Sequence, residues 1–181
     1  MTKKQELLLN ELYDLLPENT AEFYKNAVNF ITDLGYMPQK QKVSVFTLSF
    51  RHKNGPAMAK IAIHPDEVKF RIKFYACKDV PEWCIKALWT EDYEDEQAGR
   101  FQGNKRKPLD DIPPPPGVVM KKCIGSCKTC GGMKYYYKFH DREIYHCSAY
   151  PVLIPNADEI NMDELKHVIS EQHRYFLSLM Q

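Results

Sequence analysis

The sequence has no long apolar run and no excess of charge of one sign. Its 181 residues carry 25 Lys and Arg against 24 Asp and Glu, a formal net charge of +1. This balance excludes a generally basic nucleic-acid coat protein and a strongly acidic tail. No stretch approaches the roughly 18 apolar residues of a membrane span, and residues 1–16 lack the continuous apolar segment of a signal peptide. We therefore expect a cytoplasmic protein in a reducing compartment, without a membrane partner.

Signatures of the common enzyme classes are also missing. The sequence contains no HExxH, no phosphate-loop glycine pattern and no GxSxG. Its six histidines predict no separate site, and His167 and His173, six residues apart, do not share one face of a helix. Five carboxylates lie within residues 91–96, a run more typical of a solvated segment than of an acid–base pair. No reaction is predicted, and a non-enzymatic role is favoured.

The apolar residues that are present recur at helical spacing in several segments. Helices are predicted over residues 4–16, between Asn19 and Gly35, after Asp79, and from Asn161 to about Met180. Asn19 with Glu22 resembles a capping box, and Gly35 is a natural residue to end that helix. The apolar stripes predicted to pack in the core include Leu7, Leu12 and Leu15 near the start, and Leu165, Val168, Ile169, Phe176 and Leu177 near the end.

Alternating apolar and polar residues predict strands in two parts of the chain. The strands of the first part cover residues 42–51, 57–64 and 68–77, and short turns make them an antiparallel meander. The second part has a short strand over residues 118–122 and a hairpin over residues 133–140 and 144–150. The predicted fold class is therefore α+β, with helices packed on an antiparallel sheet.

Four of the six cysteines fall within residues 123–147, and this cluster is the most informative feature of the sequence. Cysteines in a reducing compartment are more often thiols or metal ligands than disulfides. Cys127 and Cys130, followed by two glycines, have the form of a zinc knuckle, in which backbone amides approach the sulfurs. The predicted ligands of one Zn²⁺ are Cys123, Cys127, Cys130 and Cys147. A closed set of four thiolates leaves no position for water, so the metal is predicted to be structural.

Other ligands and other thiol chemistry remain open. His140 or His146 can replace an outer cysteine, and Cys77 can reach the site from the first sheet. A redox role is the main alternative for the CxxC pair, although glycines rather than a helix N-terminus follow it. Cys77 and Cys84 lie apart from the cluster and are better explained as small apolar residues of the core.

An iron–sulfur cluster is a further alternative. Cys123, Cys127 and Cys130 form a CxxxCxxC spacing, which is similar to the cluster-binding signature of radical S-adenosylmethionine enzymes. The resemblance covers eight residues and implies that these three cysteines hold a cluster. Enzymes of that family carry a strand-and-helix barrel after the motif, and such a barrel needs more residues than follow Cys130. We therefore favour zinc.

Basic residues suggest a nucleic-acid-binding zinc module as a weaker alternative. Ten Lys and Arg but only three Asp lie in residues 99–142. The three consecutive tyrosines of residues 135–137 lie in the same segment and can stack on bases, while the cations neutralise phosphates. On the first sheet, alternation predicts one basic face from Lys60, Lys69, Arg71 and Lys73. A solvated surface explains the same residues, and we favour it.

Together these features predict a single α+β domain over residues 1–181. Residues 1–96 form an ααβββα portion, residues 97–117 a Gly- and Pro-rich basic loop, and residues 118–181 a zinc-braced hairpin followed by the C-terminal helix. The expected function is a zinc-stabilised binding or interaction protein whose partner is a small molecule or a protein. A thiol-redox or other enzyme is the alternative.

Overall fold

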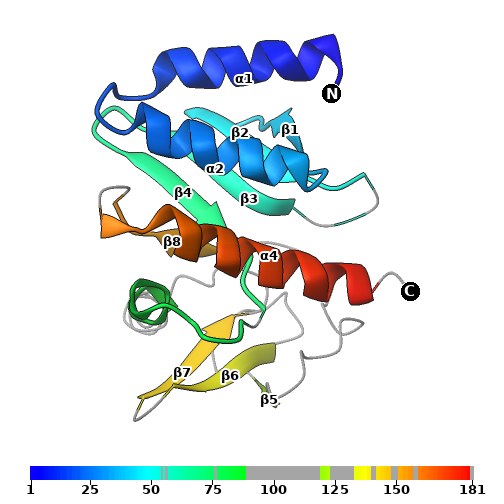
Figure 1. Cartoon of the computed structure of the whole chain (residues 1–181), viewed down its shortest axis with the longest axis vertical. Coiled ribbons are helices and arrows are strands. Elements are labelled where there is room, and N and C mark those ends of the chain that lie inside the picture. The colour runs from blue at the N-terminus through cyan, green and yellow to red at the C-terminus, as the bar shows by residue number, and fades with distance from the viewer. Residues whose placement is uncertain are drawn as a thin grey trace.

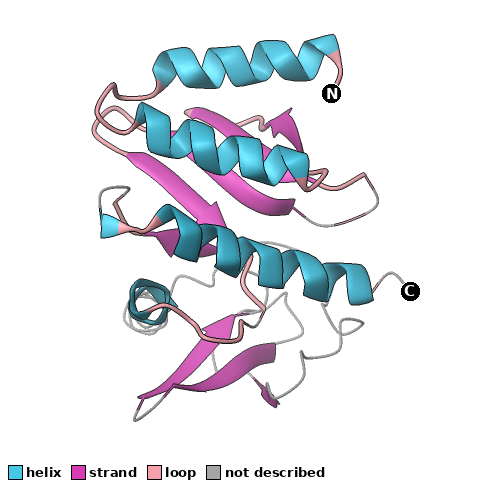
Figure 2. Cartoon of the chain, in the orientation of Figure 1, coloured by secondary structure: helices cyan, strands magenta, loops and turns pink. Residues whose placement is uncertain are grey.

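The computed structural model describes residues 1–53, 55, 57–75, 77–88, 119–122, 133–139, 142–147, 151–156 and 159–179. These residues form an α+β fold with two antiparallel sheets (Figure 1), and Figure 2 separates its helices and strands by colour. The first sheet has the order β1-β2-β3-β4-β8, and the second has the order β5-β6-β7. The predicted fold class, helices with an antiparallel sheet, is confirmed at this level.

The strands of the first sheet come from both ends of the chain. They are β1 (Met37–Lys40), β2 (Phe46–Arg51), β3 (Ala57–Ile63), β4 (Val68–Ile72) and β8 (Val152–Ile154). Two rows of register partners are buried across four strands, and they consist of Leu48, Ile61, Phe70 and Ile154, and of Phe50, Ala59, Ile72 and Val152. Because alternate residues of a strand share a face, these rows form the apolar face on which the core is built.

The central meander of the sheet is confirmed, but its predicted limits are not. Residues 42–45 are not a strand, and β1 instead pairs with β2, with Pro38 opposite Phe50. Strand β4 ends at Ile72 rather than continuing to Cys77, since Tyr75 turns away and donates its N–H to the buried Gln172 side chain at 2.6 Å. The second edge is provided by β8, which pairs with β4. The alternation pattern missed both edges: β1 is a short strand that pairs with the nearby β2, and β8 reaches β4 from a distant segment of the chain.

Two N-terminal helices cover part of this sheet. Helix α1 (Lys3–Leu15) begins with a capping box in which Thr2 and Gln5 bond reciprocally, and it contacts β1. It buries Leu9 and Leu12, whereas Leu7 is 61% exposed and Leu15 is 45% exposed. The predicted apolar stripe was therefore partly wrong, because the buried face of α1 is narrower than the leucine spacing suggested.

Helix α2 (Ala21–Asp33) packs on the apolar sheet face through Tyr24, whose ring lies 6.1 Å from that of Phe70. The predicted Asn19 capping box is wrong, because Thr20 is the N-cap residue and makes no side-chain cap bond. Gly35 follows the C-cap residue, as predicted, and has a positive φ of +88°. Backbone N–H groups of Gly35 and Tyr36 donate to Thr32 and Ile31 carbonyls and close the last turn.

Helix α4 (Met162–Ser178) contacts both α2 and β3. Its predicted cap is confirmed, since the Asn161 side chain accepts a hydrogen bond from the Asp163 N–H at 2.8 Å. Its predicted core residues are buried except Leu177, which is 39% exposed. The fully buried polar residue of this helix is Gln172, whose amide also donates to the Val168 carbonyl at 3.1 Å. No helix in the described part of the chain is long and apolar enough to cross a bilayer.

The second sheet consists of β5 (Val119–Lys122), β6 (Met133–Phe139) and β7 (Arg142–Cys147). The predicted short strand and hairpin are both present, and Phe139 pairs with Arg142 next to the hairpin connection. Residues 97–117, predicted to form a basic loop, lie outside the described residues.

Candidate functional site

The described residues that flank the cysteine cluster in the sequence lie at one end of the second sheet. Strand β5 ends at Lys122, which pairs with Met133 at the start of β6. Strand β7 ends at Cys147, which pairs with Lys134, the next residue of β6. The connection between β5 and β6 therefore leaves and re-enters the sheet at the end where β7 finishes. This connection carries Cys123, Cys127 and Cys130, which lie outside the described residues.

The alternative histidine ligands differ in their positions along this sheet. His146 precedes Cys147 on β7 and pairs with Tyr135. His140 lies outside the described residues, but it follows Phe139, which is at the opposite end of β6 from Met133. Six residue steps of about 3.4 Å separate the two ends of β6, or roughly 20 Å. The two histidines thus adjoin opposite ends of the sheet.

Cys77 and Cys84 differ from the clustered cysteines, because both thiols are held within the described part of the fold. Cys77 follows β4, and its thiol donates to the Lys78 carbonyl at 3.2 Å. Burial, with the nearby Glu171 and Asp79 carboxylates, raises the pKa of this thiol to about 12. Cys84 is fully buried in the helix of residues 82–88, and burial raises its thiol pKa well above the usual range. Both thiols are therefore protonated at neutral pH and are poor nucleophiles.

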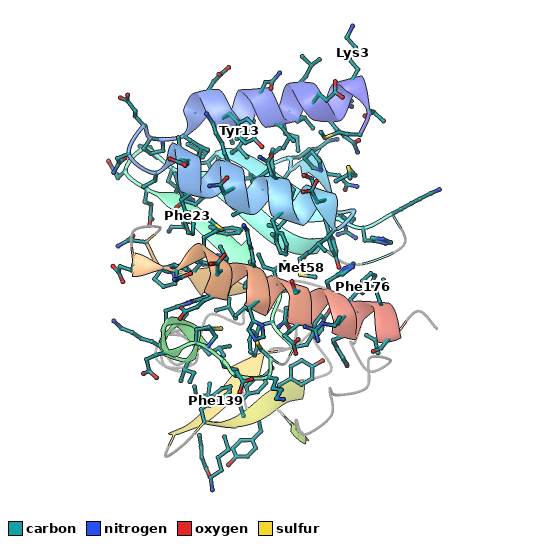
Figure 3. All side chains as sticks on the ribbon, in the orientation of Figure 1. Lys3, Tyr13, Phe23, Met58, Phe139 and Phe176 are labelled. Carbon is teal, nitrogen blue, oxygen red and sulfur yellow. The ribbon has the colours of Figure 1, made fainter. Side chains whose placement is uncertain are left out.

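The second sheet is attached to the rest of the protein through a short series of buried hydrogen bonds. Tyr137 of β6 donates its hydroxyl to the Tyr75 carbonyl at 2.6 Å. The Tyr75 N–H in turn donates to Gln172 of α4. Aromatic rings pack around these bonds, and the centroid of the Tyr137 ring lies 5.5 Å from that of Phe74 and 5.7 Å from that of Phe139. Figure 3 labels Phe139 on the second sheet and Phe176 on α4. The end of β4, helix α4 and strand β6 are joined at this point.

A second polar group within the aromatic core was not predicted from the sequence. Tyr36 has no exposed surface, and its hydroxyl is hydrogen-bonded to His173 Nδ1 at 3.1 Å. The ring of His52 also lies against Tyr36, with the two centroids 5.6 Å apart. Because His52 and His173 belong to elements far apart in the sequence, no spacing pattern relates them. Only the packing of α4 on the first sheet brings the two imidazoles to one tyrosine.

The strand pairing of the first sheet brings three of the four residues of the predicted basic face together. Lys60 pairs with Arg71, and Lys69 lies two residues before Arg71 on β4, so alternation puts all three on one face. Lys69 and Arg71 interact within the protein. Lys69 pairs with Glu67 at 2.8 Å, and Arg71 donates to the Pro151 carbonyl at 3.4 Å. Lys73 is buried and its ammonium lies 5.4 Å from the centroid of the Tyr75 ring.

No group of three or more His, Cys, Asp or Glu side chains able to hold a metal occurs among the described residues. Comparisons with protein-family models, with curated proteins and with solved structures find no match to this chain.

Proposed function

We propose that this chain is a zinc-stabilised binding or interaction protein in which Cys123, Cys127, Cys130 and Cys147 hold one structural Zn²⁺. The observation that supports this most directly is the register of the second sheet, because Lys122, Met133 and Cys147 all lie at the same end. Neighbouring strands are about 4.8 Å apart, so β5 and β7 on either side of β6 are separated by roughly 10 Å. Thiolates about 2.3 Å from a shared ion can bridge that separation.

The same register favours cysteines over the other ligands. His140 adjoins the far end of β6, and Cys77 follows β4 of the first sheet with its thiol bonded to Lys78. His146 and Cys147 are consecutive on β7, and Cys147 is the residue nearer the end of the sheet. We therefore take Cys147 as the outer ligand. Four thiolates then complete the tetrahedron.

A structural role for the metal follows from the size of the second sheet. Three short strands are near the lower limit for a sheet that is stable by itself. Zinc binding contributes directly to the folding free energy of small metal-braced units. The hydrogen bond from Tyr137 to Tyr75 and the surrounding rings would then hold the braced sheet against α4. In this proposal zinc maintains a surface for a partner and takes no part in a reaction.

The test is elemental analysis of untagged protein purified under reducing conditions, with three variants analysed in parallel. Wild-type protein is expected to contain close to one zinc per chain, and Cys127→Ser is expected to lose it. Cys77→Ser is the matched control, since it removes a thiol outside the proposed site and should keep the metal. His140→Gln should also keep it. Equal zinc content in wild type and Cys127→Ser would overturn the proposed ligands, and iron in place of zinc would favour the cluster enzyme.

A further inference from the structure

Two histidines flank one buried tyrosine where the C-terminal half of α4 packs on the first sheet. His52 lies in the loop after β2 and His173 lies on α4. The ring centroid of each is 5.6 Å from that of Tyr36. Phe176, one turn after His173, closes the group at 5.5 Å from His52. The group therefore joins three separate segments of the chain through two imidazoles and two aromatic rings.

The surroundings of the His173 imidazole contain little that would stabilise a positive charge. Burial, together with the nearby His52, lowers the pKa of His173. His52 Nδ1 is buried and has no hydrogen-bond partner within the described part of the chain. The charged neighbours of His173 on α4, Glu171 and Arg174, form an ion pair with each other.

Charges on the other elements give no compensation either. The residues on either side of His52, Arg51 and Lys53, are exposed cations. Tyr36 is neutral, and burial raises its pKa far above the ordinary value. Tyr75, the next titratable group beyond Tyr36, has its pKa raised to about 12, mainly by burial. A proton on the His173 imidazole would therefore add positive charge to an aromatic group in which no described carboxylate is paired with it.

The turn of α4 that carries His173 also holds two other parts of the protein. Gln172 accepts the hydrogen bond from Tyr75, and Tyr75 accepts the one from Tyr137 of the second sheet. Phe176 packs so closely on Gly55 that a Cβ built there would lie 2.0 Å from its Cζ. Movement of this turn would reach both the second sheet and the connection between β2 and β3.

We propose that His52, Tyr36 and His173 form an acid-sensitive catch that holds the C-terminal half of α4 on the first sheet and releases it as the pH falls below neutrality. The direction of this pH dependence follows from the linkage between proton binding and closure. A histidine whose pKa is lower in the folded state binds fewer protons there than in the released state, so closure is favoured at neutral pH and weakens as the pH falls through about 6.5. Release frees Gln172 and Phe176 from their contacts.

Hydrogen exchange at pH 7.5 and pH 5.5, corrected for the intrinsic rates, tests this release. Amides of residues 172–178 in the wild type are expected to lose at least about fivefold protection at the lower pH. His173→Asn keeps an oxygen near the position of Nδ1 but does not titrate, so its protection should be the same at both pH values. His64→Asn, which alters a histidine in the β3–β4 turn, should behave as the wild type. Unchanged protection in the wild type, or equal loss in His173→Asn, would overturn the proposal.

A titration of the wild type by NMR tests the catch without a variant. The imidazole carbon-bound protons of His173 should titrate with a midpoint below the ordinary value of about 6.5, and the ring protons of Tyr36 should shift with the same midpoint. A midpoint at or above 6.5 for His173, or a Tyr36 ring that does not respond, would contradict the proposed role.

Discussion

The contact between Gly55 and Phe176 leads to a prediction whose size can be worked out from the structure. Gly55 does not have a positive φ, so alanine meets no backbone strain there. A Cβ at this position would lie 2.0 Å from Cζ, 2.6 Å from Cε2 and 3.0 Å from Cε1 of the Phe176 ring. To restore an ordinary contact of 3.4 Å from 2.0 Å, the ring must retreat by about 1.4 Å. Phe176 is only 5% exposed and packs against His52 and Tyr36, so the movement disturbs the whole group.

Overpacking of this kind costs about 1–3 kcal/mol in a well-packed core. For a protein of this size, 1 kcal/mol corresponds to about 2–4 °C in melting temperature. We therefore expect Gly55→Ala to lower the melting temperature by about 4–8 °C, for a loss near 2 kcal/mol. Thermal unfolding followed by circular dichroism, with a denaturant titration at 25 °C, measures both quantities.

A double-mutant cycle separates the clash from any other effect of the added methyl group. Phe176→Leu removes the far edge of the ring, so Gly55→Ala in that background should cost less than about 0.5 kcal/mol. The coupling energy between the two sites should then exceed about 1 kcal/mol. The reasoning is refuted if Gly55→Ala is neutral in the wild type, or if it costs the same with and without the phenylalanine ring.

Four further predictions follow from individual contacts. Gly35→Ala should cost about 1 kcal/mol in a denaturant titration, because Gly35 has φ of +88° while its Cβ would have room at 3.6 Å from His52; Gly35→Asn should cost less. Tyr137→Phe should cost about 1–3 kcal/mol by leaving the buried Tyr75 carbonyl without its donor, whereas Tyr13→Phe, which removes an exposed bond to Asn29, should change stability by under about 0.5 kcal/mol. Asn161→Ala should cost about 1 kcal/mol in thermal unfolding and Thr20→Ala much less, since Asn161 makes a side-chain cap bond and Thr20 makes none. Alkylation of Cys77 at pH 8, followed by peptide mass spectrometry, should be at least about a hundredfold slower than that of a free thiol, because its pKa is raised to about 12; rapid labelling would instead support a redox role.

Release of α4 at low pH and loss of the proposed zinc are separable by experiment. The catch consists of residues on the first sheet and α4, and none of them is a proposed ligand. The Cys127→Ser variant should therefore retain the pH dependence of exchange in residues 172–178, even where its second sheet is less stable. His173→Asn should in turn retain zinc. A variant that lost both properties would show that the metal and the catch are one structural unit.

Features that depend on neighbouring residues could be predicted from the amino-acid sequence. The Asn161 cap, the left-handed Gly35 and the hairpin of the second sheet all appear where the local pattern predicted them. A cap bond, a positive φ and the pairing of two strands joined by a short connection are set by residues close together in the chain, so their signals are contained in short windows. The α+β class follows from the same local periodicities.

Which of these local elements pack against one another depends on contacts between distant parts of the fold. The β8 edge of the first sheet, the exposure of Leu7 and the early end of β4 depend on partners from distant segments. The group around Tyr36 depends on such partners as well, since His52 and His173 become neighbours when α4 packs on the sheet. The spacing of apolar residues indicates that a face can be buried. Which element covers that face depends on side-chain packing and on backbone pairing across the whole fold.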